Sequence, residues 1–421
     1  MSDKYIIQGG TPLKGEVSVS GSKNSALGII AAAMALDGPC VIENLPKIQD
    51  IRVLLTICEE LGAKIEWING NTISFDPAEV KTHTAISENV SKIRGSYYLL
   101  GAFLGKFKKV SLLLPGGCDF GSRPIDLHIK GFQALGGGDL REENGVISIE
   151  ANHLKGAGVF LDMISVGATI NIMLAAVKAE GVTVINNAAK EPHIVDVANF
   201  LNTMGADIRG AGTDVIKITG KPYLEANRSY TIIPDQIEAG TYMIMAAMTH
   251  GDITCTNLIP KHMEPLSAKL IEMGALVEEG DDSIRVALLA EDKLKAVSFK
   301  TMPYPGFPTD LQPQATTLLT SALGTGRMIE SVWENRFQYI KELQSMGANI
   351  VTSGKLAVVQ GSELHGTTVF ARDLRAGAAL VTAGLMAKGQ TTVTNVYAIE
   401  RGYENFVDKL KSVRAQIEVV P

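Results

Sequence analysis

The sequence predicts an α/β protein that contains six copies of one unit. A turn of small residues between a helix and a strand recurs along the chain as LGAKI, LGGGD, MGADI, MGALV, MGANI and a degenerate VRAQI, beginning at Leu61, Leu135, Met204, Met273, Met346 and Val413. The second residues of these motifs lie 74, 69, 69, 73 and 67 positions apart. A helix rich in Ala, Gly and Met and then a strand precede each turn. Such regular alternation of helices and strands is typical of a repeated α/β fold.

The elements of each unit follow in a fixed order. The first helices are expected to begin near Ser22, Ile93, Ser165, Asp235, Asp310 and Asp373. They are apolar over most of their circumference, so we expect them to be buried. Strands are predicted next, at VIENLP, VSLLLP, VTVINNA, ITCTNLI, MIESV and TTVTNVY. A loop, a second helix and the recurrent turn complete each unit.

The length favours two domains of three units each. A unit of about 70 residues is too long for a solenoid repeat and too short for a typical independent domain. The pattern breaks near residues 229–234, so the first domain is predicted at residues 22–231. The second is predicted at residues 1–21 plus 232–421, because the strand Lys4–Gln8 has no partner in the first unit.

Composition excludes several classes of protein. Of the 421 residues, 46% are hydrophobic and 20% charged, as in a globular protein. The longest apolar run, 26–36, is 11 residues, against about 20 for a membrane span, and no secretory signal is visible at the start. We therefore expect a cytoplasmic protein. The net charge of −6 argues against nucleic acid or an anionic membrane as a partner, and no Cys or His spacing indicates a metal site.

Six cations occupy recurrent positions in the units. Lys23, Arg94 and Arg375 stand at helix starts, and Arg123, Arg336 and Arg401 stand in loops after strands. A helix N-terminus carries partial positive charge, so a cation there is unfavourable unless an anion binds. One interpretation is therefore a pocket for an anionic small molecule. The alternative is that Lys23 and Arg94 are solvated surface charges, and that Arg336 and Arg401 pair with neighbouring glutamates.

Three further segments carry candidate chemistry. Cys118 lies in an enlarged glycine-rich loop near Arg123, where a thiol with a lowered pKa can act as acid or nucleophile. Asp310 follows the proline-rich segment PYPGFPT, which would hold a general base in a fixed position. Residues 165–167 can offer backbone N–H groups to a phosphate. The alternatives are an incidental exposed cysteine, an N-cap aspartate and a plain helix start.

These segments resemble the enolpyruvyl transferase family, in its UDP-N-acetylglucosamine 1-carboxyvinyltransferase branch. The resemblance covers essentially the whole chain through GSKNSAL (21–27), PGGCDFGSRPIDLH (115–128), SVGAT (165–169), GFPTDLQPQ (306–314), ENRF (334–337), RDLRAGAAL (372–380) and ERGYENF (400–406). It implies two inside-out α/β barrel domains, each with three βαβαββ units around buried helices. The substrates would bind in a cleft between the domains.

The resemblance also implies a reaction and its residues. Phosphoenolpyruvate and UDP-N-acetylglucosamine would give the 3′-enolpyruvyl ether and phosphate, the first committed step of peptidoglycan synthesis, without a cofactor. Cys118 would be the proton donor and site of covalent attachment, and Asp310 the base. Phosphoenolpyruvate would be bound by Lys23, Asn24, Arg123, Arg375 and Arg401, with Asp373 and Arg336 in support. UDP-N-acetylglucosamine would contact Arg94, Arg123, Pro124, Ile125, Asp126, Leu127, His128, Ser165, Val166, Gly167, Asp310 and Val332.

Two details of the resemblance bear on experiments. Met163 stands where some members have a lysine, which puts one nucleotide contact in doubt. Cys118 predicts sensitivity to fosfomycin, which alkylates this thiol. Two other functions stay open: the sister activity on shikimate 3-phosphate, whose enzymes lack the PGGC loop, and a silent homologue that binds a UDP-sugar and regulates the pathway.

Overall fold

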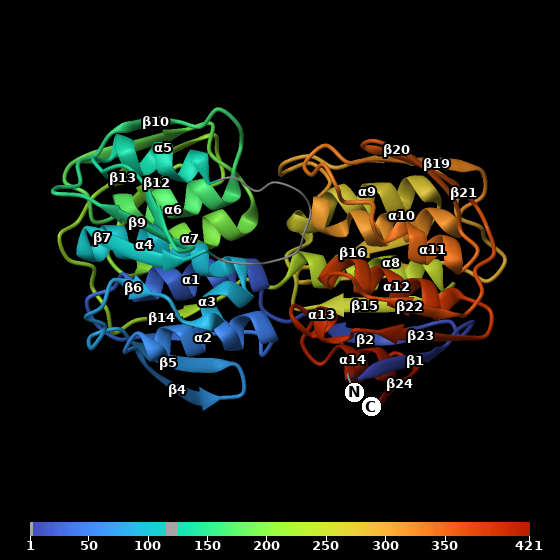
Figure 1. Cartoon of the computed structure of the whole chain (residues 1–421). Helices are drawn as coiled ribbons and strands as arrows, with labels where there is room; N and C mark the ends of the chain where they lie inside the picture. The colour runs from blue at the N-terminus through green and yellow to red at the C-terminus, as the bar shows by residue number, and fades with distance from the viewer. Residues whose placement is uncertain (1–2, 115–124) are drawn as a thin grey trace. The chain divides into compact units, whose positions relative to one another are not determined.

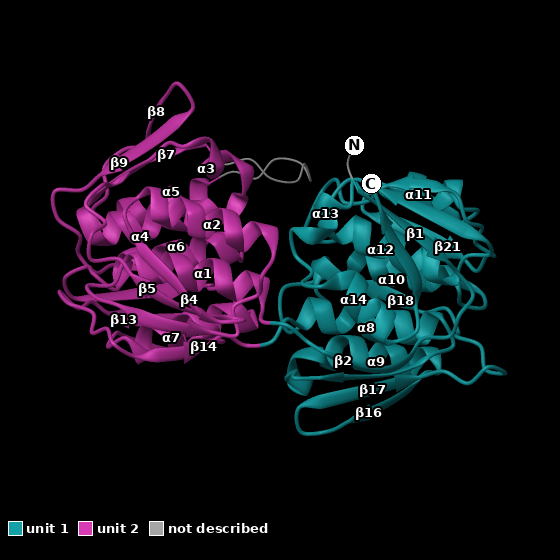
Figure 2. Ribbon diagram, turned by 90° about the horizontal axis from the view of Figure 1, so that it is seen from below, with its two compact units in different colours: residues 1–20, 119–121, 234–421 teal, residues 21–118, 122–233 magenta. Residues whose placement is uncertain are grey.

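The computed structural model describes residues 3–114 and 125–421, which form two compact units (Figures 1 and 2). One unit contains residues 21–114 and 125–233, and the other contains residues 3–20 and 234–421. Each unit encloses its own hydrophobic core.

The described residues form six four-stranded sheets, three in each unit, all with one topology. In the third repeat, β10 (Gly158–Phe160) runs parallel to β11 (Val182–Asn186). β13 (Val215–Thr219) then pairs antiparallel with both β11 and β12 (Asp207–Arg209). The predicted six-unit α/β architecture is confirmed, although the described strands of each unit form three separate sheets and no closed barrel.

The other five sheets repeat this order with the following strands. In the unit of residues 21–233 they are β14 (Ser229–Thr231), β3 (Cys40–Glu43), β5 (Thr72–Asp76), β4 (Lys64–Asn69), and β6 (Thr84–Ala85), β7 (Lys109–Leu113), β9 (Val146–Glu150), β8 (Arg141–Glu143). In the other unit they are β2 (Lys14–Ser18), β15 (Asp252–Thr256), β17 (Ser283–Ala287), β16 (Leu276–Glu279); β18 (Ser298–Lys300), β19 (Thr325–Ile329), β21 (Leu356–Gln360), β20 (Asn349–Ser353); and β22 (Thr368–Phe370), β23 (Gln390–Thr394), β1 (Lys4–Gln8), β24 (Gln416–Val420).

Three strands reach their sheets from distant parts of the chain. β14 follows the third repeat but supplies the parallel edge strand of the first sheet, beside β3. β2 does the same for the sheet of β15. β1 lies between β23 and β24 and is antiparallel to both. The first 20 residues therefore complete two sheets of the unit that contains the C-terminus.

The first helix of each repeat is buried, as predicted. These helices are α1 (Lys23–Met34), α4 (Tyr98–Phe107), α6 (Val166–Ala176), α8 (Gln236–Met248), α10 (Gln312–Thr320) and α12 (Leu374–Met386). Small side chains let them approach closely. A Cβ on Gly101 of α4 would lie 2.2 Å from the carbonyl oxygen of Asn171 in α6. The Asn171 side chain also accepts from the Gly101 N–H at 2.8 Å, which joins the two helices at the same point.

The second helices end in the recurrent turn. They are α2 (Gln49–Glu60), α5 (Asp126–Ala134), α7 (Pro192–Thr203), α9 (Glu264–Met273), α11 (Ile340–Ser345) and α14 (Phe406–Ser412), with the short helices α3 (Glu88–Lys92), η1 (Arg94–Tyr97), η2 (Pro260–Met263), η3 (Thr309–Leu311) and α13 (Tyr397–Glu400) elsewhere. In all six copies the second residue of the turn has a positive φ. Glycine provides this conformation five times, and Arg414 adopts it in the sixth copy with φ 74°.

An asparagine with left-handed backbone follows the central strand in four repeats. These residues are Asn44, Asn187, Asn257 and Asn395. In each case the side-chain amide donates at 2.7–2.9 Å to the carbonyl of the residue that follows the parallel neighbouring strand. The asparagine therefore ties together the ends of two strands. Leu114 and Glu330 occupy this position in the second and fifth repeats.

Candidate active site

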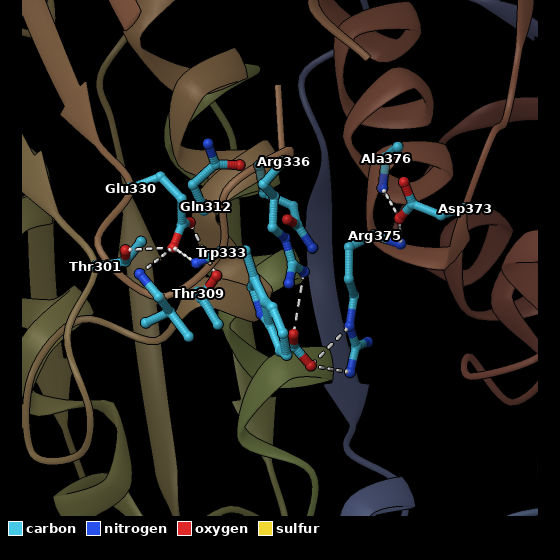
Figure 3. A network of polar contacts seen from close by, with 12 residues as sticks. Thr301, Thr309, Gln312, Glu330, Trp333, Arg336, Asp373, Arg375 and Ala376 are labelled. Carbon is cyan, nitrogen blue, oxygen red and sulfur yellow. Dashed lines mark hydrogen bonds and ion pairs between the residues drawn. The ribbon is translucent and has the colours of Figure 1, made fainter. Parts of the chain in front are cut away.

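In the unit that contains the C-terminus, Asp310 is held by two arginines. Its Oδ1 accepts from Arg336 Nη2 at 3.1 Å, and its Oδ2 accepts from Arg375 Nη2 at 3.1 Å and Nε at 3.3 Å (Figure 3). The Asp310 side chain is 29% exposed, against 3% and 5% for the two arginines. Asp310 is the second residue of η3, and the N-cap positions of η3 and α10 are held by Pro308 and Leu311. Its interpretation as a plain N-cap is therefore wrong.

The neighbouring helix start fixes Arg375. Asp373 is the N-cap of α12 and accepts from the backbone N–H groups of Arg375 at 2.9 Å and Ala376 at 3.0 Å (Figure 3). The Arg375 guanidinium lies 5.6 Å from the centre of the Tyr403 ring. Burial by itself would lower the pKa of Arg375, but Asp310, Tyr403 and Asp235 together outweigh burial, and the pKa is raised. The arginine therefore remains charged although it is buried.

Arg401 belongs to a segment that packs against the same helix start. It follows α13 and is partly buried. A Cβ on the adjacent Gly402 would lie 2.4 Å from Cδ2 of Leu374, the residue before Arg375. Glycine at 402 therefore permits the close approach of this loop to α12. The structure thus brings both Arg336 and Arg375 into contact with Asp310, and places the backbone beside Arg401 against the start of α12.

In the other unit, Lys23 is the first residue of α1 and pairs with Asp50. Their Nζ and Oδ2 atoms are 2.8 Å apart, and the side chains are 13% and 6% exposed. Ser22 caps the helix, and Asn24 follows Lys23. The interpretation of Lys23 as a solvated surface charge is therefore wrong. Asp50 offsets a cation that would otherwise be unfavourable at a helix N-terminus.

Arg94, His128 and Gly167 gather in this same unit. The Arg94 guanidinium lies 5.0 Å from the Tyr97 ring centre, and the Tyr97 and His128 rings lie 6.5 Å apart. A Cβ on Gly167 would lie 2.8 Å from His128 Nε2. Burial, and secondly the charge of Arg94, lower the pKa of His128 to about 4. The imidazole is therefore neutral at pH 7.

The remaining predicted contacts fall at helix starts or outside the described residues. Ser165 caps α6, its Oγ accepting from Ala168 N at 3.2 Å, and Val166 is the first residue of that helix. Ile125 precedes α5, which begins with Asp126 and Leu127. Cys118, Arg123 and Pro124 lie outside the described residues. Within residues 3–114 and 125–421, no group of three or more His, Cys, Asp or Glu side chains is arranged to hold a metal.

Sequence reasoning missed several partners of these residues. Asp50, Tyr97 and Tyr403 were not singled out, because their contacts join elements whose packing the sequence does not show. Glu330 was also missed, although a signal was present. It stands where other repeats have the asparagine of the strand-end pattern, and an acidic residue there departs from the repeat. Val332, two residues later, is 38% exposed.

Comparison with known proteins identifies the class to which this fold and site belong. The sequence profile described as EPSP synthase (3-phosphoshikimate 1-carboxyvinyltransferase) matches residues 7–410. The chain belongs to this family of enzymes, the carboxyvinyl (enolpyruvyl) transferases.

Full-length relatives narrow the comparison. The chain is 52% identical over 416 residues to UDP-N-acetylglucosamine 1-carboxyvinyltransferase 3 of Caldanaerobacter subterraneus subsp. tengcongensis, and covers 99% of it. It is 52% identical over 417 residues to UDP-N-acetylglucosamine 1-carboxyvinyltransferase of Halothermothrix orenii, again covering 99%. Each alignment spans 99% of this chain.

Solved structures agree on the fold. The enolpyruvyl transferase NikO from Streptomyces tendae has a TM-score of 0.90 at 27% identity, with 100% of both chains covered. EPSP synthase from Acinetobacter baumannii has a TM-score of 0.77 at 20% identity, also over 100% of both chains. Within the described part of the chain, no helix is long and apolar enough to cross a membrane.

Proposed function

We propose that this enzyme transfers the enolpyruvyl group of phosphoenolpyruvate to the 3′-hydroxyl of UDP-N-acetylglucosamine and releases phosphate. The observation that carries the proposal is the Asp310 carboxylate, partly exposed and held by two buried arginines. A base must be fixed near the hydroxyl that it deprotonates, and two arginines fix both oxygens of this carboxylate. The full-length relatives named for this reaction support the choice of acceptor.

The chemistry proceeds by addition and then elimination. Asp310 takes the proton of the sugar 3′-hydroxyl, and the 3′-oxygen bonds to C2 of phosphoenolpyruvate. Cys118 gives a proton to C3. The tetrahedral adduct then loses a proton from C3 and expels phosphate, which restores the double bond. Cys118 is also the site at which phosphoenolpyruvate attaches covalently.

Charged side chains replace a metal in binding the anionic substrates. Lys23, Arg123 and Arg401 bind the phosphate of phosphoenolpyruvate, Arg375 binds its carboxylate, and Asn24 orients the reacting groups. Nη1 of Arg375 has no hydrogen-bond partner among the described residues, which leaves its two N–H donors for that carboxylate. Asp373 and Arg336 support Arg375 and Asp310 through the contacts given above.

The nucleotide sugar contacts residues from both units. Arg94, His128 and Gly167, already close together, bind it with Ser165 and Val166. The remaining contacts are Arg123, Pro124, Ile125, Asp126, Leu127, Asp310 and Val332. Because Asp310 and Arg94 belong to different units, the reaction requires both.

The cellular setting follows from the substrates. The enzyme acts in the cytoplasm on two small molecules and commits UDP-N-acetylglucosamine to peptidoglycan synthesis, and so to cell wall growth and division. Fosfomycin is expected to inactivate it by alkylating Cys118.

The first test measures phosphate release from phosphoenolpyruvate with UDP-N-acetylglucosamine, and separately with shikimate 3-phosphate. We expect release only with UDP-N-acetylglucosamine, and a loss of at least about 100-fold in Cys118→Ala, because the proton donor is removed. Cys40→Ala is the matched control, since Cys40 is a buried thiol whose pKa is raised to about 12, chiefly by burial.

The alternative outcomes are distinct. Phosphate release with shikimate 3-phosphate as acceptor would show that the protein has the sister activity. If UDP-N-acetylglucosamine binds but phosphoenolpyruvate releases no phosphate with either acceptor, the protein is a silent regulatory homologue. Equal alkylation of wild type and Cys118→Ala by fosfomycin would show that the role given to Cys118 is wrong.

A further inference from the structure

We propose that Glu330 is a positioning residue that fixes Asp310 and the loop of Arg336 relative to each other. The inference rests on the function proposed above, because it assigns the purpose of the contact to the base of that reaction. Glu330 follows β19 and is 1% exposed.

The carboxylate of Glu330 collects donors from three segments of the chain. Its Oε1 accepts from Thr301 Oγ1 and Val332 N, both at 2.8 Å, and from Trp333 N at 3.0 Å. Its Oε2 accepts from Thr309 Oγ1 at 2.9 Å (Figure 3). All four of these donors are neutral, so the buried carboxylate is stabilised by oriented hydrogen bonds.

The repeat shows what is unusual about this arrangement. At the same position, Asn44, Asn187, Asn257 and Asn395 each donate one hydrogen bond to the end of the parallel neighbouring strand. Joining two strand ends therefore requires only an amide donor. Glu330 accepts hydrogen bonds at this position, where the asparagines donate one. It also contacts two further segments, at Thr309 and at Val332–Trp333, which the asparagines do not.

Those two segments carry the candidate base and its partner. Thr309 directly precedes Asp310, and Val332 and Trp333 begin the loop that leads to Arg336. Arg336 returns to Asp310 through the 3.1 Å contact between Nη2 and Oδ1. Glu330 and Asp310 are thus two links between the same pair of segments. Loss of the Glu330 link would therefore remove one of these two connections and loosen the segment that carries Asp310.

Glu330→Gln is the informative substitution. The glutamine oxygen can still accept from the backbone N–H groups of Val332 and Trp333, and the hydroxyl of Thr309 can rotate to accept from the new amide. We therefore expect a folded protein whose Thr309–Asp310 turn is slightly displaced. Because small misplacements of reacting groups are costly, kcat should fall roughly 10- to 100-fold while KM for UDP-N-acetylglucosamine changes less than about threefold. Glu330→Asp, which keeps the carboxylate, should retain more activity.

Two comparisons separate positioning from general structural damage. Asn257→Asp removes the equivalent strand-end contact in the fourth repeat, which contributes no proposed site residue, and aspartate tolerates the left-handed backbone. It should leave kcat unchanged. In an Asp310→Asn background, assayed at high enzyme concentration, Glu330→Gln should cause no further loss, because the residue acts through Asp310.

The results that would overturn the inference can be told apart from failure of the proposed function. No phosphate release by wild type would remove both. Wild-type release with normal kcat in Glu330→Gln would overturn the inference alone. So would an equal loss in Asn257→Asp, or a full further loss of activity when Glu330→Gln is added to Asp310→Asn.

Discussion

At the scale of single residues, burial lowers the pKa of basic side chains in both units, and the neighbouring charges decide the net shift. Arg375 lies against the Asp310 carboxylate, which raises its pKa despite burial. His128 lies near Arg94, and burial and that positive charge both lower its pKa. The first group therefore remains a cation for an anionic ligand, whereas the second can contribute packing and a neutral ring nitrogen.

The lowered pKa of His128 predicts a dependence of stability on pH. In the unfolded chain a histidine has a pKa near 6.5, whereas in the folded protein the pKa of His128 is about 4. Between these values the unfolded chain binds more protons, so stability falls as pH decreases from 6.5 towards 4. At pH 5 the loss from this residue is on the order of 2 kcal/mol relative to pH 7.5.

Urea unfolding at pH 7.5 and pH 5 measures this effect. His128→Gln, which cannot titrate, serves as the reference and cancels contributions from other groups such as His262, whose pKa is also lowered by burial. Wild type should lose more stability than His128→Gln on acidification. Parallel pH profiles for the two proteins would contradict the low pKa of His128.

At the scale of elements, the recurrent turn requires one backbone conformation but tolerates different residues. Five copies use glycine at positive φ, and Arg414 adopts φ 74° in the sixth. A side chain in this region costs roughly 1–2 kcal/mol, because Cβ approaches the following carbonyl. Glycine avoids that strain but gains entropy in the unfolded chain.

Arg414→Gly should therefore stabilise the protein by about 0.5–1 kcal/mol. Gly274→Ala is the converse variant, because nothing lies within 4 Å of the added Cβ and only backbone strain is introduced. It should destabilise the protein by about 1 kcal/mol. Denaturant midpoints measure both changes. A lower midpoint for Arg414→Gly would show that the arginine side chain makes a contact worth more than the strain.

At the scale of the whole molecule, a fragment can fold alone only if it contains every strand of its sheets. Residues 21–233 contain β14, which pairs with β3 and ends beside Asp196. Asp196 is buried, and its carboxylate accepts from Tyr230 Oη at 2.6 Å and Ile233 N at 3.3 Å. Removing this segment would expose an edge of the first sheet and leave a buried carboxylate without these donors.

We therefore expect a fragment of residues 21–233 to unfold cooperatively and a fragment of residues 21–227 to lose that transition. A fragment of residues 234–421 should not fold, because β1 and β2 come from the N-terminus. Circular dichroism during heating would report each transition. A cooperative transition in the 21–227 fragment would show that β14 is dispensable.

Local patterns in the sequence determined much of this protein. The periodic turn, the apolar first helices and the strands that follow them were predicted correctly. Each of these elements depends on residues that are close together in the sequence. The cations Lys23 and Arg375 were recognised as unusual for the same reason, since a helix start can be read locally. The motifs around Cys118 and Asp310 indicated the family, which the comparisons confirmed.

Only the tertiary structure decided which distant groups meet. The pairing of β1 with the C-terminal strand, the two arginines on Asp310 and the donors around Glu330 join residues far apart in the chain. Such contacts depend on the packing of whole elements, to which many residues contribute and which no local pattern encodes. Asp310 thus looked like an N-cap from its neighbours in sequence, and its ion pairs became visible only when three separate segments were placed together.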